Sequence, residues 1–194
     1  MPTIKIPIEV SARHVHLSGK DLERLFGDKY ELTAAKALSQ GEQYAARETV
    51  TLKTAKDVII NVRLIGPVRQ QSQVEISRTD AFRLGINPPL RVSGDPKDSP
   101  GIAIMEAEGN TLDLKEGVII AQRHIHASTE DAKKHKLKNG QVVKVKIDGP
   151  RGLILENVVV RVAPDFNWNL HLDTDEGNAA GVGKEVLFGE VIIK

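Results

Sequence analysis

Short segments rich in Val and Ile, separated by Gly, Pro, Asp and Asn, run along most of the chain and constrain its fold most strongly. This pattern is typical of an all-β barrel or sandwich, with a few short helical pieces between the strands. Turns are expected at 94–101 and 147–152, where Gly and Pro cluster. The expected strands are Ile4–Val10, Glu48–Leu52, Val58–Leu64, Gln73–Ile76, Gly117–Ala121, Gln141–Ile147, Asn157–Val162, Trp168–Leu172 and Glu185–Ile193.

The length of 194 residues allows one large domain or two small ones, and the absence of a long linker favours packed domains over tethered ones. The charge is balanced, with 27 Lys and Arg against 26 Asp and Glu, so no global basic field indicates a nucleic-acid partner. The chain has no cysteine, which excludes disulfides, thiolate metal ligands and a thiol nucleophile. Any bound metal must therefore use imidazole and carboxylate groups.

The first residues, M-P-T-I-K-I-P-I-E-V, lack the apolar core of a signal peptide, and no apolar run approaches the length of a membrane span. We therefore expect a cytoplasmic protein without a membrane partner.

One nine-residue phrase occurs twice and uses four of the six histidines: R-H-V-H-L-S-G-K-D at 13–21 and R-H-I-H-A-S-T-E-D at 123–131. Each H-x-H closes an extended segment. Each is followed by Ser and, three residues later, by Asp, which resembles a capping box and predicts the start of a short helix.

The same strand-to-helix junction is found twice more, at 73–85 and at 170–176. The four expected helix caps are Ser18, Ser77, Ser128 and Asp173. Two residues before each cap stands a good zinc ligand, and these four are His16, Glu75, His126 and His171. A recurring ligand at one position of one recurring unit indicates a metal site.

Residues i and i+2 of a strand share a face, so His14 can act with His16, and His124 with His126. Six ligands suit two open catalytic zinc sites of three protein ligands each. One closed site with spare histidines, or a structural metal, remains an alternative. The helix N-termini that follow the ligands favour anions, and four arginines nearby in sequence favour phosphate or another oxyanion. These arginines are Arg13, Arg63, Arg69 and Arg123.

Ordinary interpretations compete with these. A single H-x-H on a strand is more often a surface or core histidine than a ligand pair; two matched copies with Glu75 and His171 reverse that preference. His135, in a polar helix, is expected to be solvated. The basic residues between Lys53 and Arg91 are equally compatible with an ordinary charged face.

Several longer motifs resemble one family over nearly the whole chain, in order. They are I-P-I-E-V-S-A-R-H-V-H-L-S, G-P-V-R-Q-Q-S-Q-V-E-I-S-R-T-D-A, P-L-R-V-S-G-D, L-K-E-G-V-I-I-A-Q-R-H-I-H and H-L-D-T-D-E-G-N-A-A. The family is the PduL-type phosphotransacylases, or phosphate propanoyltransferases. The resemblance implies the reversible conversion of acyl-CoA and phosphate into acyl phosphate and CoA. It also implies two β-barrels and a two-zinc site.

The resemblance implies a catalytic, phosphate-binding role for Arg69. The implied zinc ligands are His14, His16, Glu75, His124, His126 and His171, the set that the junctions also give. The implied CoA contacts are Val10, Ser11, Ala12, Lys56, Arg63 and Asn178.

Two features depart from the family pattern. Ala12 stands where the family phrase V-S-N-R-H has Asn, so any CoA contact of Ala12 would use its backbone. Family members in microcompartments carry an N-terminal targeting extension, and here the first strand is expected to begin within a few residues of Met1. This speaks against a microcompartment lumen and for the cytoplasm.

We therefore expect a mainly β protein of two packed β-barrels with short helices at the strand junctions. One barrel should comprise 1–46 with 115–194 and the other 47–114, and the two R-H-x-H strands should be pseudo-equivalent partners in one barrel. The expected activity is phosphate acyltransfer with small-molecule substrates, and a homodimer is left open. The alternatives are a zinc-dependent thioester or phosphoester hydrolase and a non-catalytic, zinc-stabilised CoA-binding module.

Overall fold

A computed structural model describes residues 3–183 and 185–193, and the chain divides into two compact units, each described here by itself. Unit 1 comprises Met1–Ser11, Ser39–Gly41 and Gln122–Lys194, and unit 2 comprises Ala12–Leu38 and Glu42–Ala121. Strands predominate, and the described residues form four short helices. The expected mainly β class is confirmed. Among the described residues, no helix has the length and apolar character needed to cross a membrane.

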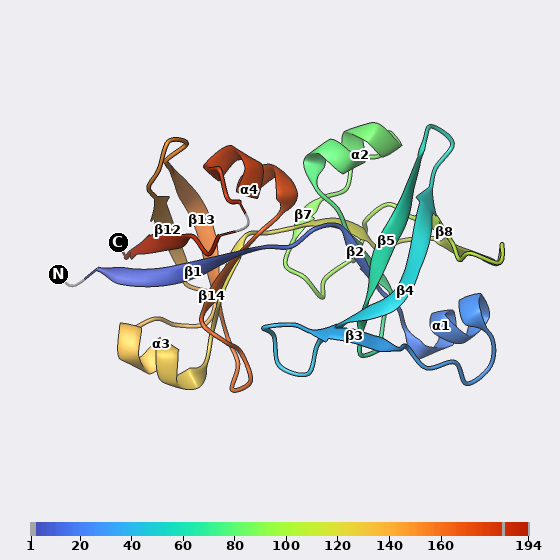
Figure 1. The fold of residues 1–194 in the computed structure, drawn as a ribbon, viewed down its shortest axis with the longest axis horizontal. Helices are drawn as coiled ribbons and strands as arrows, with labels where there is room; N and C mark the ends of the chain where they lie inside the picture. Colours follow the sequence, from blue (N-terminus) through green and yellow to red (C-terminus); the bar gives the residue numbers. More distant parts are fainter. Residues whose placement is uncertain (1–2, 184, 194) are drawn as a thin grey trace. The chain divides into compact units, whose positions relative to one another are not determined.

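Unit 1 is a closed barrel, and Figure 1 labels four of its strands, β1, β12, β13 and β14. Its hydrogen-bonded neighbours follow the order β1-β14-β11-β13-β12-β15. Closure pairs every strand on both sides and so leaves no exposed edge. Its helices are α3 (Thr129–His135) and α4 (Thr174–Ala180). Its strands are β1 (Ile4–Val10), β11 (His124–Ala127), β12 (Val142–Ile147), β13 (Leu153–Val162), β14 (Asn169–Leu172) and β15 (Phe188–Ile192).

The barrel core of unit 1 follows from alternation along its strands. In β12, Val143, Val145 and Ile147 are buried while the residues between them are less covered. Ile6 and Ile8 of β1 are buried in the same core. Because side chains on a strand alternate between its two faces, this spacing sends one apolar row into the barrel.

Unit 2 contains a nine-stranded open sheet with the order β7-β10-β6-β2-β5-β4-β8-β9, and β3 pairs with β4. In Figure 1, β3, β4 and β5 follow one another along the chain. One of the two expected barrels is thus a curled, open sheet. Its helices are α1 (Gly19–Phe26) and α2 (Arg78–Leu84). Its strands are β2 (His14–His16), β3 (Ala34–Ala37), β4 (Tyr44–Lys53), β5 (Val58–Gly66), β6 (Gln73–Glu75), β7 (Leu90–Arg91), β8 (Ile102–Met105), β9 (Thr111–Leu114) and β10 (Val118–Ala121).

The core of unit 2 joins the curled sheet to α1. Leu22 and Leu25 of α1 pack in one apolar cluster with Leu52, Leu64 and Ile104 of the sheet. The two leucines lie three residues apart, so they share one face of the helix. This burial holds α1 against the sheet.

The four helix caps predicted from the sequence are confirmed. The side chains of Ser18, Ser77, Ser128 and Asp173 each accept a hydrogen bond from the backbone N–H three residues later. Full capping boxes form at α2, α3 and α4. At α1 the Ser18 N–H donates instead to the Ser72 hydroxyl, which itself donates to Asp21. All four junctions therefore fix the strand end that precedes the helix.

The prediction that the two R-H-x-H strands are partners in one barrel is wrong. His14 lies on β2 in the open sheet of unit 2, and His124 lies on β11 in the closed barrel of unit 1. Nor does either H-x-H simply close the preceding strand. β1 ends at Val10 in unit 1 before the chain enters unit 2, and β10 ends at Ala121 in unit 2 before the chain enters unit 1. Because the chain changes sheet at these points, the strand must be interrupted there.

The two H-x-H strands nevertheless occupy equivalent places in their separate sheets. β2 runs antiparallel to β6 with His14 opposite Glu75, and β11 runs antiparallel to β14 with His124 opposite His171. On its other side each strand has a parallel neighbour, β5 for β2 and β13 for β11. The sequence repeat thus corresponds to a structural repeat.

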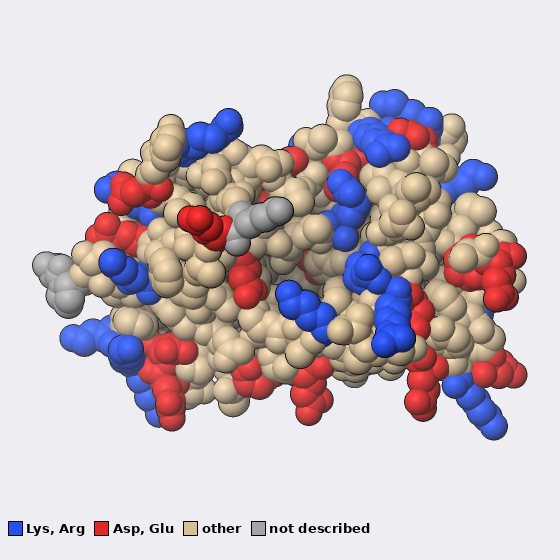
Figure 2. Space-filling view, in the orientation of Figure 1, with Lys and Arg blue, Asp and Glu red and all other residues tan. Residues whose placement is uncertain are grey.

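Most expected strands form with shifted ends. β1 has the expected bounds, whereas β15 begins at Phe188 rather than Glu185. Sequence analysis missed β3, β7, β8 and β9, which are short, and did not give β2 and β11 as separate strands. The compact units also divide the chain differently from the expected 1–46 with 115–194 and 47–114, because 12–38, 42–46 and 115–121 fall in unit 2. Basic and acidic side chains are interspersed over the face shown in Figure 2.

Candidate metal centres and phosphate site

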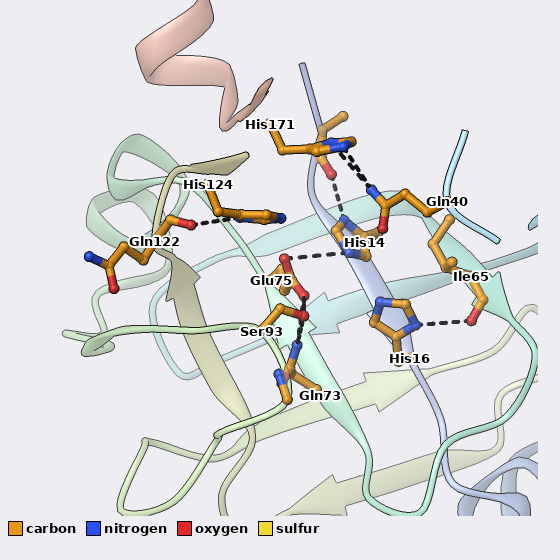
Figure 3. Close-up of polar contacts among 12 residues, drawn as sticks. His14, His16, Gln40, Ile65, Gln73, Glu75, Ser93, Gln122, His124 and His171 are labelled. Carbon is orange, nitrogen blue, oxygen red and sulfur yellow. Dashed lines mark hydrogen bonds and ion pairs between the residues drawn. The ribbon is translucent and has the colours of Figure 1, made fainter. Parts of the chain in front are cut away.

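In unit 2, three predicted ligands converge on one point. One potential ligand atom from each of His14, His16 and Glu75 lies within 4.8 Å of the other two. The two histidines come from β2 and Glu75 from the antiparallel neighbour β6 (Figure 3). We call these residues the unit 2 triad. Two imidazoles and a carboxylate, with an open fourth position, are a donor set that catalytic zinc takes in proteins.

Both imidazoles of the unit 2 triad are oriented by backbone carbonyls. His14 Nδ1 lies 2.8 Å from the Ala12 carbonyl oxygen, and His16 Nδ1 lies 3.2 Å from that of Ile65 (Figure 3). A carbonyl only accepts, so these contacts require Nδ1 to carry the proton. In the neutral form of each ring, Nε2 then has the lone pair that a metal needs.

Two further side chains fix the Glu75 carboxylate. Gln73 Nε2 and the Ser93 hydroxyl both donate to Glu75 Oε1, each at 2.6 Å (Figure 3). The other oxygen, Oε2, lies 3.6 Å from His14 Nε2. One carboxylate oxygen is therefore held by the protein, and the other is turned toward the histidines.

Burial and neighbouring charges shift the pKa of all three groups of the unit 2 triad. Burial alone would raise the pKa of the Glu75 carboxyl group, but attraction by His14 and its hydrogen bond outweigh burial and hold that pKa far below its ordinary value. Burial acts to lower the pKa of His14, but Glu75 outweighs it and the net direction is upward. Burial lowers the pKa of His16 well below its ordinary value, and the charges of His14 and Arg69 act in the same direction. Glu75 is thus ionised and His16 neutral, as metal ligation requires.

Arg69 lies beside the unit 2 triad. Its backbone N–H donates to the Leu17 carbonyl at 2.9 Å, which ties it to the chain just after β2. Its Nη1 lies 3.4 Å from the Ser93 hydroxyl, the group that also holds Glu75. The positive charge of Arg69 contributes to the lowered pKa of His16. The predicted phosphate-binding residue and three predicted metal ligands are therefore neighbours in one unit.

In unit 1, the other three predicted ligands also come together. His124 and His126 come from β11 and His171 from β14, and all three are buried. We call them the unit 1 triad. Their ring centroids lie 4.6 Å apart for His124 and His126, 4.5 Å for His126 and His171, and 5.2 Å for His124 and His171. Three imidazoles are another donor set of catalytic zinc sites.

The unit 1 triad repeats a local contact of the unit 2 triad. His124 Nδ1 lies 2.8 Å from the carbonyl oxygen of Gln122, two residues earlier, as His14 does with Ala12 (Figure 3). His171 Nδ1 lies 3.8 Å from Glu9 Oε2 and 3.2 Å from the Gln40 amide nitrogen. A carboxylate near the second nitrogen of an imidazole is a common outer partner of metal-binding histidines.

All four arginines that sequence analysis placed near phosphate contact acceptors of the chain itself, and for Arg69 the acceptor is the Ser93 hydroxyl. Arg13 pairs with Asp80, Arg123 pairs with Glu176, and Arg63 Nη1 donates to two backbone carbonyls. Proximity in sequence to a helix N-terminus therefore does not indicate which of these arginines binds an anion. Arg69 is distinguished by its contact with Ser93, the residue whose hydroxyl also holds Glu75.

The six predicted CoA contacts divide between the units. Val10, Ser11 and Asn178 belong to unit 1, and Ala12, Lys56 and Arg63 belong to unit 2. Lys56, Arg63 and Asn178 are exposed, and Lys56 Nζ donates to the Phe82 carbonyl at 2.9 Å. The Ala12 carbonyl accepts from His14. His135, which was expected to be solvated, is partly covered by stacking on Trp168.

Sequence analysis missed the residues that hold the ligands. Gln73 had a usable signal, since it lies two residues before Glu75 and therefore on the same face of β6. Ser93, Gln40 and Glu9 had none, because their contacts join positions far apart in the sequence.

Comparisons with known proteins identify the family of the chain. The family model described as phosphate propanoyltransferase matches residues 7–183. A phosphate propanoyltransferase of Thermotoga maritima is 54% identical over 90% of this chain and 83% of its own. Those of Salmonella typhimurium and Listeria monocytogenes are 50% and 46% identical, over 96% and 97% of this chain and 89% and 88% of their own. The resemblance predicted from the sequence is confirmed, and the chain belongs to the phosphate propanoyltransferase family of phosphotransacylase enzymes.

Proposed function

We propose that this chain transfers a short-chain acyl group between CoA and phosphate with the help of two zinc ions, one held by each triad. The observation that carries the proposal is the convergence of His14, His16 and Glu75 within 4.8 Å beside Arg69. Family membership supplies the reaction class, and this convergence supplies groups suited to phosphate.

The residues of both triads fit zinc by their chemistry. In unit 2, backbone carbonyls and two side chains already hold the donor groups in place, so binding an ion costs little ordering entropy. In unit 1, three buried imidazoles offer nitrogen donors. When bound, zinc supplies positive charge that stabilises an oxyanion.

Arg69 is the proposed phosphate-binding residue. Its planar guanidinium group can donate two parallel hydrogen bonds to two phosphate oxygens, which a lysine cannot do. The bond from its backbone to Leu17 fixes the start of this side chain relative to β2. Arg69 thus orients the phosphate so that one of its oxygens remains available for attack.

The proposed chemistry is direct transfer. A phosphate oxygen attacks the carbonyl carbon of the thioester, the carbon–sulfur bond breaks, and CoA leaves as its thiolate. The chain has no cysteine, so no acyl-thioenzyme intermediate can form. In direct transfer, phosphate and acyl-CoA are bound together, and the enzyme acts by positioning and charge stabilisation.

For CoA we propose contacts from Val10, Ser11, Ala12, Lys56, Arg63 and Asn178. The exposed cationic groups of Lys56 and Arg63 suit the phosphates of a nucleotide moiety. Ala12 would contact CoA through its backbone, because its methyl group offers no hydrogen bond.

One assay tests the proposal. The protein is incubated with acetyl-CoA or propanoyl-CoA, with and without phosphate, and released CoA is measured with a thiol reagent. Because the chain contains no cysteine, the protein adds no background to this signal. Release that requires phosphate, and that is lost with a chelator and restored by zinc, is the expected result.

The two rival functions give different outcomes in this assay. Release of CoA without phosphate would indicate a zinc-dependent hydrolase, and the proposal would be wrong. No release under any condition, together with CoA binding, would indicate a binding module.

A further inference from the structure

Arg13, the residue directly before His14, binds the Asp80 carboxylate in the first turn of α2, the helix that follows Glu75. Arg13 Nε donates to Asp80 Oδ2 at 2.9 Å, and Arg13 Nη2 lies 2.9 Å from Asp80 Oδ1. Asp80 is buried and is the acid of the capping box of α2, where its Oδ2 also accepts from the Ser77 N–H at 3.4 Å. Both oxygens of the carboxylate therefore bind the guanidinium fork, and one of them also binds the cap.

Arg123, the residue directly before His124, makes the corresponding contact in unit 1. Arg123 Nε lies 3.1 Å from Glu176 Oε1. Glu176 is the acid of the capping box of α4, and its other oxygen, Oε2, accepts from the Asp173 N–H at 3.0 Å. This pair is the counterpart of Arg13 and Asp80 at the equivalent junction.

In each unit, the arginine contact connects the H-x-H strand to the helix cap that follows the neighbouring ligand strand. His14 lies opposite Glu75 in its ladder, and His124 lies opposite His171 in its own. In both cases the cap stands two residues after the opposite ligand, at Ser77 or Asp173. Each arginine therefore ties the strand with two histidines to the strand end that carries the third ligand.

We propose that Arg13 and Arg123 are positioning residues, each of which fixes the geometry of the metal triad in its own unit through the capping acid of the next junction. The inference rests on the proposed function, because it assumes that the triads bind metal. The inference gives the arginine of each R-H-x-H motif a role in positioning metal ligands rather than in binding phosphate. Outer contacts of this kind typically change metal affinity by about 10–100-fold when they are removed.

The test uses Arg13→Gln and Arg123→Gln, each alone and both together, in the full chain. Zinc affinity is measured by competition with a chromophoric chelator, which resolves tight ions from weak ones. The matched control is Arg83→Gln, which removes an exposed arginine–aspartate pair, with Asp57, from the same helix α2. The control should retain wild-type affinity for both ions.

The expected result is selective. Arg13→Gln should weaken one of two ions about tenfold or more and leave the other unchanged. Arg123→Gln should do the same to one ion, and the double variant should weaken both. A purely structural role would not be selective, since general destabilisation weakens both ions together.

Each remaining outcome is decisive. If the single variants bind both ions as the wild type does, or if Arg13→Gln alone weakens both, the inference is wrong while the proposed function stands. If the wild-type protein binds no zinc, the proposed function fails and the inference fails with it.

Arg13→Gln leaves Asp80 buried without its cation, which is costly to the fold. If that variant does not fold, Arg13→Lys replaces it, because lysine keeps the charge and loses the bidentate fork. Arg13→Lys should weaken the same single ion by a smaller factor. Wild-type affinity of Arg13→Lys together with wild-type affinity of Arg123→Gln would overturn the inference.

Discussion

The Ser93 hydroxyl donates a hydrogen bond of 2.6 Å to Glu75 Oε1, and this bond joins a residue of the loop after β7 to a predicted metal ligand on β6. The same hydroxyl lies 3.4 Å from Arg69 Nη1. Ser93 therefore stands between the group proposed to bind phosphate and a group proposed to bind zinc.

Ser93→Ala removes this hydroxyl and leaves Glu75 Oε1 with Gln73 alone. We expect zinc affinity at the unit 2 triad to fall by about tenfold, because the carboxylate loses part of its orientation. The measurement is chelator competition, with Gln71→Ala as the control, since Gln71 contacts only the exposed Glu116 carboxylate among the bonds described. Unchanged affinity would mean that Gln73 suffices to orient Glu75.

Arg69→Lys keeps the positive charge and loses the guanidinium fork. We expect the KM for phosphate to rise and kcat to fall, together lowering kcat/KM about 10–100-fold, as removal of hydrogen bonds to a charged group does. Zinc content should stay normal. Arg78→Lys, which alters an exposed arginine bonded to Asn87, is the control. Normal phosphate kinetics in Arg69→Lys would place the phosphate elsewhere.

His126→Ala removes one nitrogen donor of the unit 1 triad and its stacking on Phe166. We expect the loss of one zinc ion per chain and a lower melting temperature, since a bound ion stabilises the folded state. Metal analysis and thermal unfolding measure the two effects. His135→Ala, whose ring stacks on Trp168 instead, should keep full zinc content. Full zinc content in His126→Ala would exclude His126 as a ligand.

The ion pair of His14 and Glu75 gives metal-free protein a specific pH dependence. The pKa of His14 is raised above 6.5, so its stabilising contribution is complete below pH 6.5 and is lost as pH rises through the raised value. The pKa of Glu75 is lowered from 4.5, so its contribution is present above pH 4.5 and is lost only at much lower pH. Between pH 4.5 and pH 6.5, the stabilising contributions of Glu75 and of His14 are therefore both present.

Glu75→Gln should therefore destabilise metal-free protein more at about pH 5.5 than at about pH 8.5. Urea unfolding in the presence of a chelator measures the difference at each pH. Glu116→Gln, at an exposed carboxylate bonded to Gln71, should show little dependence on pH. Equal destabilisation at both values would show that the pair does not couple to His14 protonation.

Direct transfer predicts the form of the initial-rate kinetics. Reciprocal plots at several fixed phosphate concentrations should intersect, because acyl-CoA and phosphate are bound together before any product leaves. Parallel lines would indicate a covalent acyl-enzyme intermediate on a group other than cysteine.

The helix starts and the ligand set were predictable because both depend on residues that lie close together in the sequence. Ser77 and Asp80 lie three residues apart, and the side chain of each accepts a hydrogen bond from the backbone N–H of the other. Glu75 stands two residues before Ser77, as the other three candidate ligands stand before their caps, so aligning the four junctions is enough to identify it. Such short-range patterns can be identified in the sequence without knowledge of the tertiary fold.

The sheet to which each H-x-H belongs was not predictable in the same way. β1 and β2 are separated by only Ser11, Ala12 and Arg13, and nothing in these residues shows that the chain leaves one sheet for another. Ser93 could not be assigned either, since its contact with Glu75 depends on how the loop after β7 returns to β6. Such features depend on contacts between segments far apart in the sequence, and the hydrophobic periodicity of a single segment does not predict those contacts.

The pairing of β1 has a consequence for biosynthesis. Of the described strands, β1 leaves the ribosome first, and its barrel partners, β14 and β15, leave it last. The sheet of unit 2 is complete in the nascent chain once Ala121 has been made. Until Phe188–Ile192 emerges, Ile6 and Ile8 have no barrel to enter, and β1 is an unpaired apolar strand of the kind that chaperones bind.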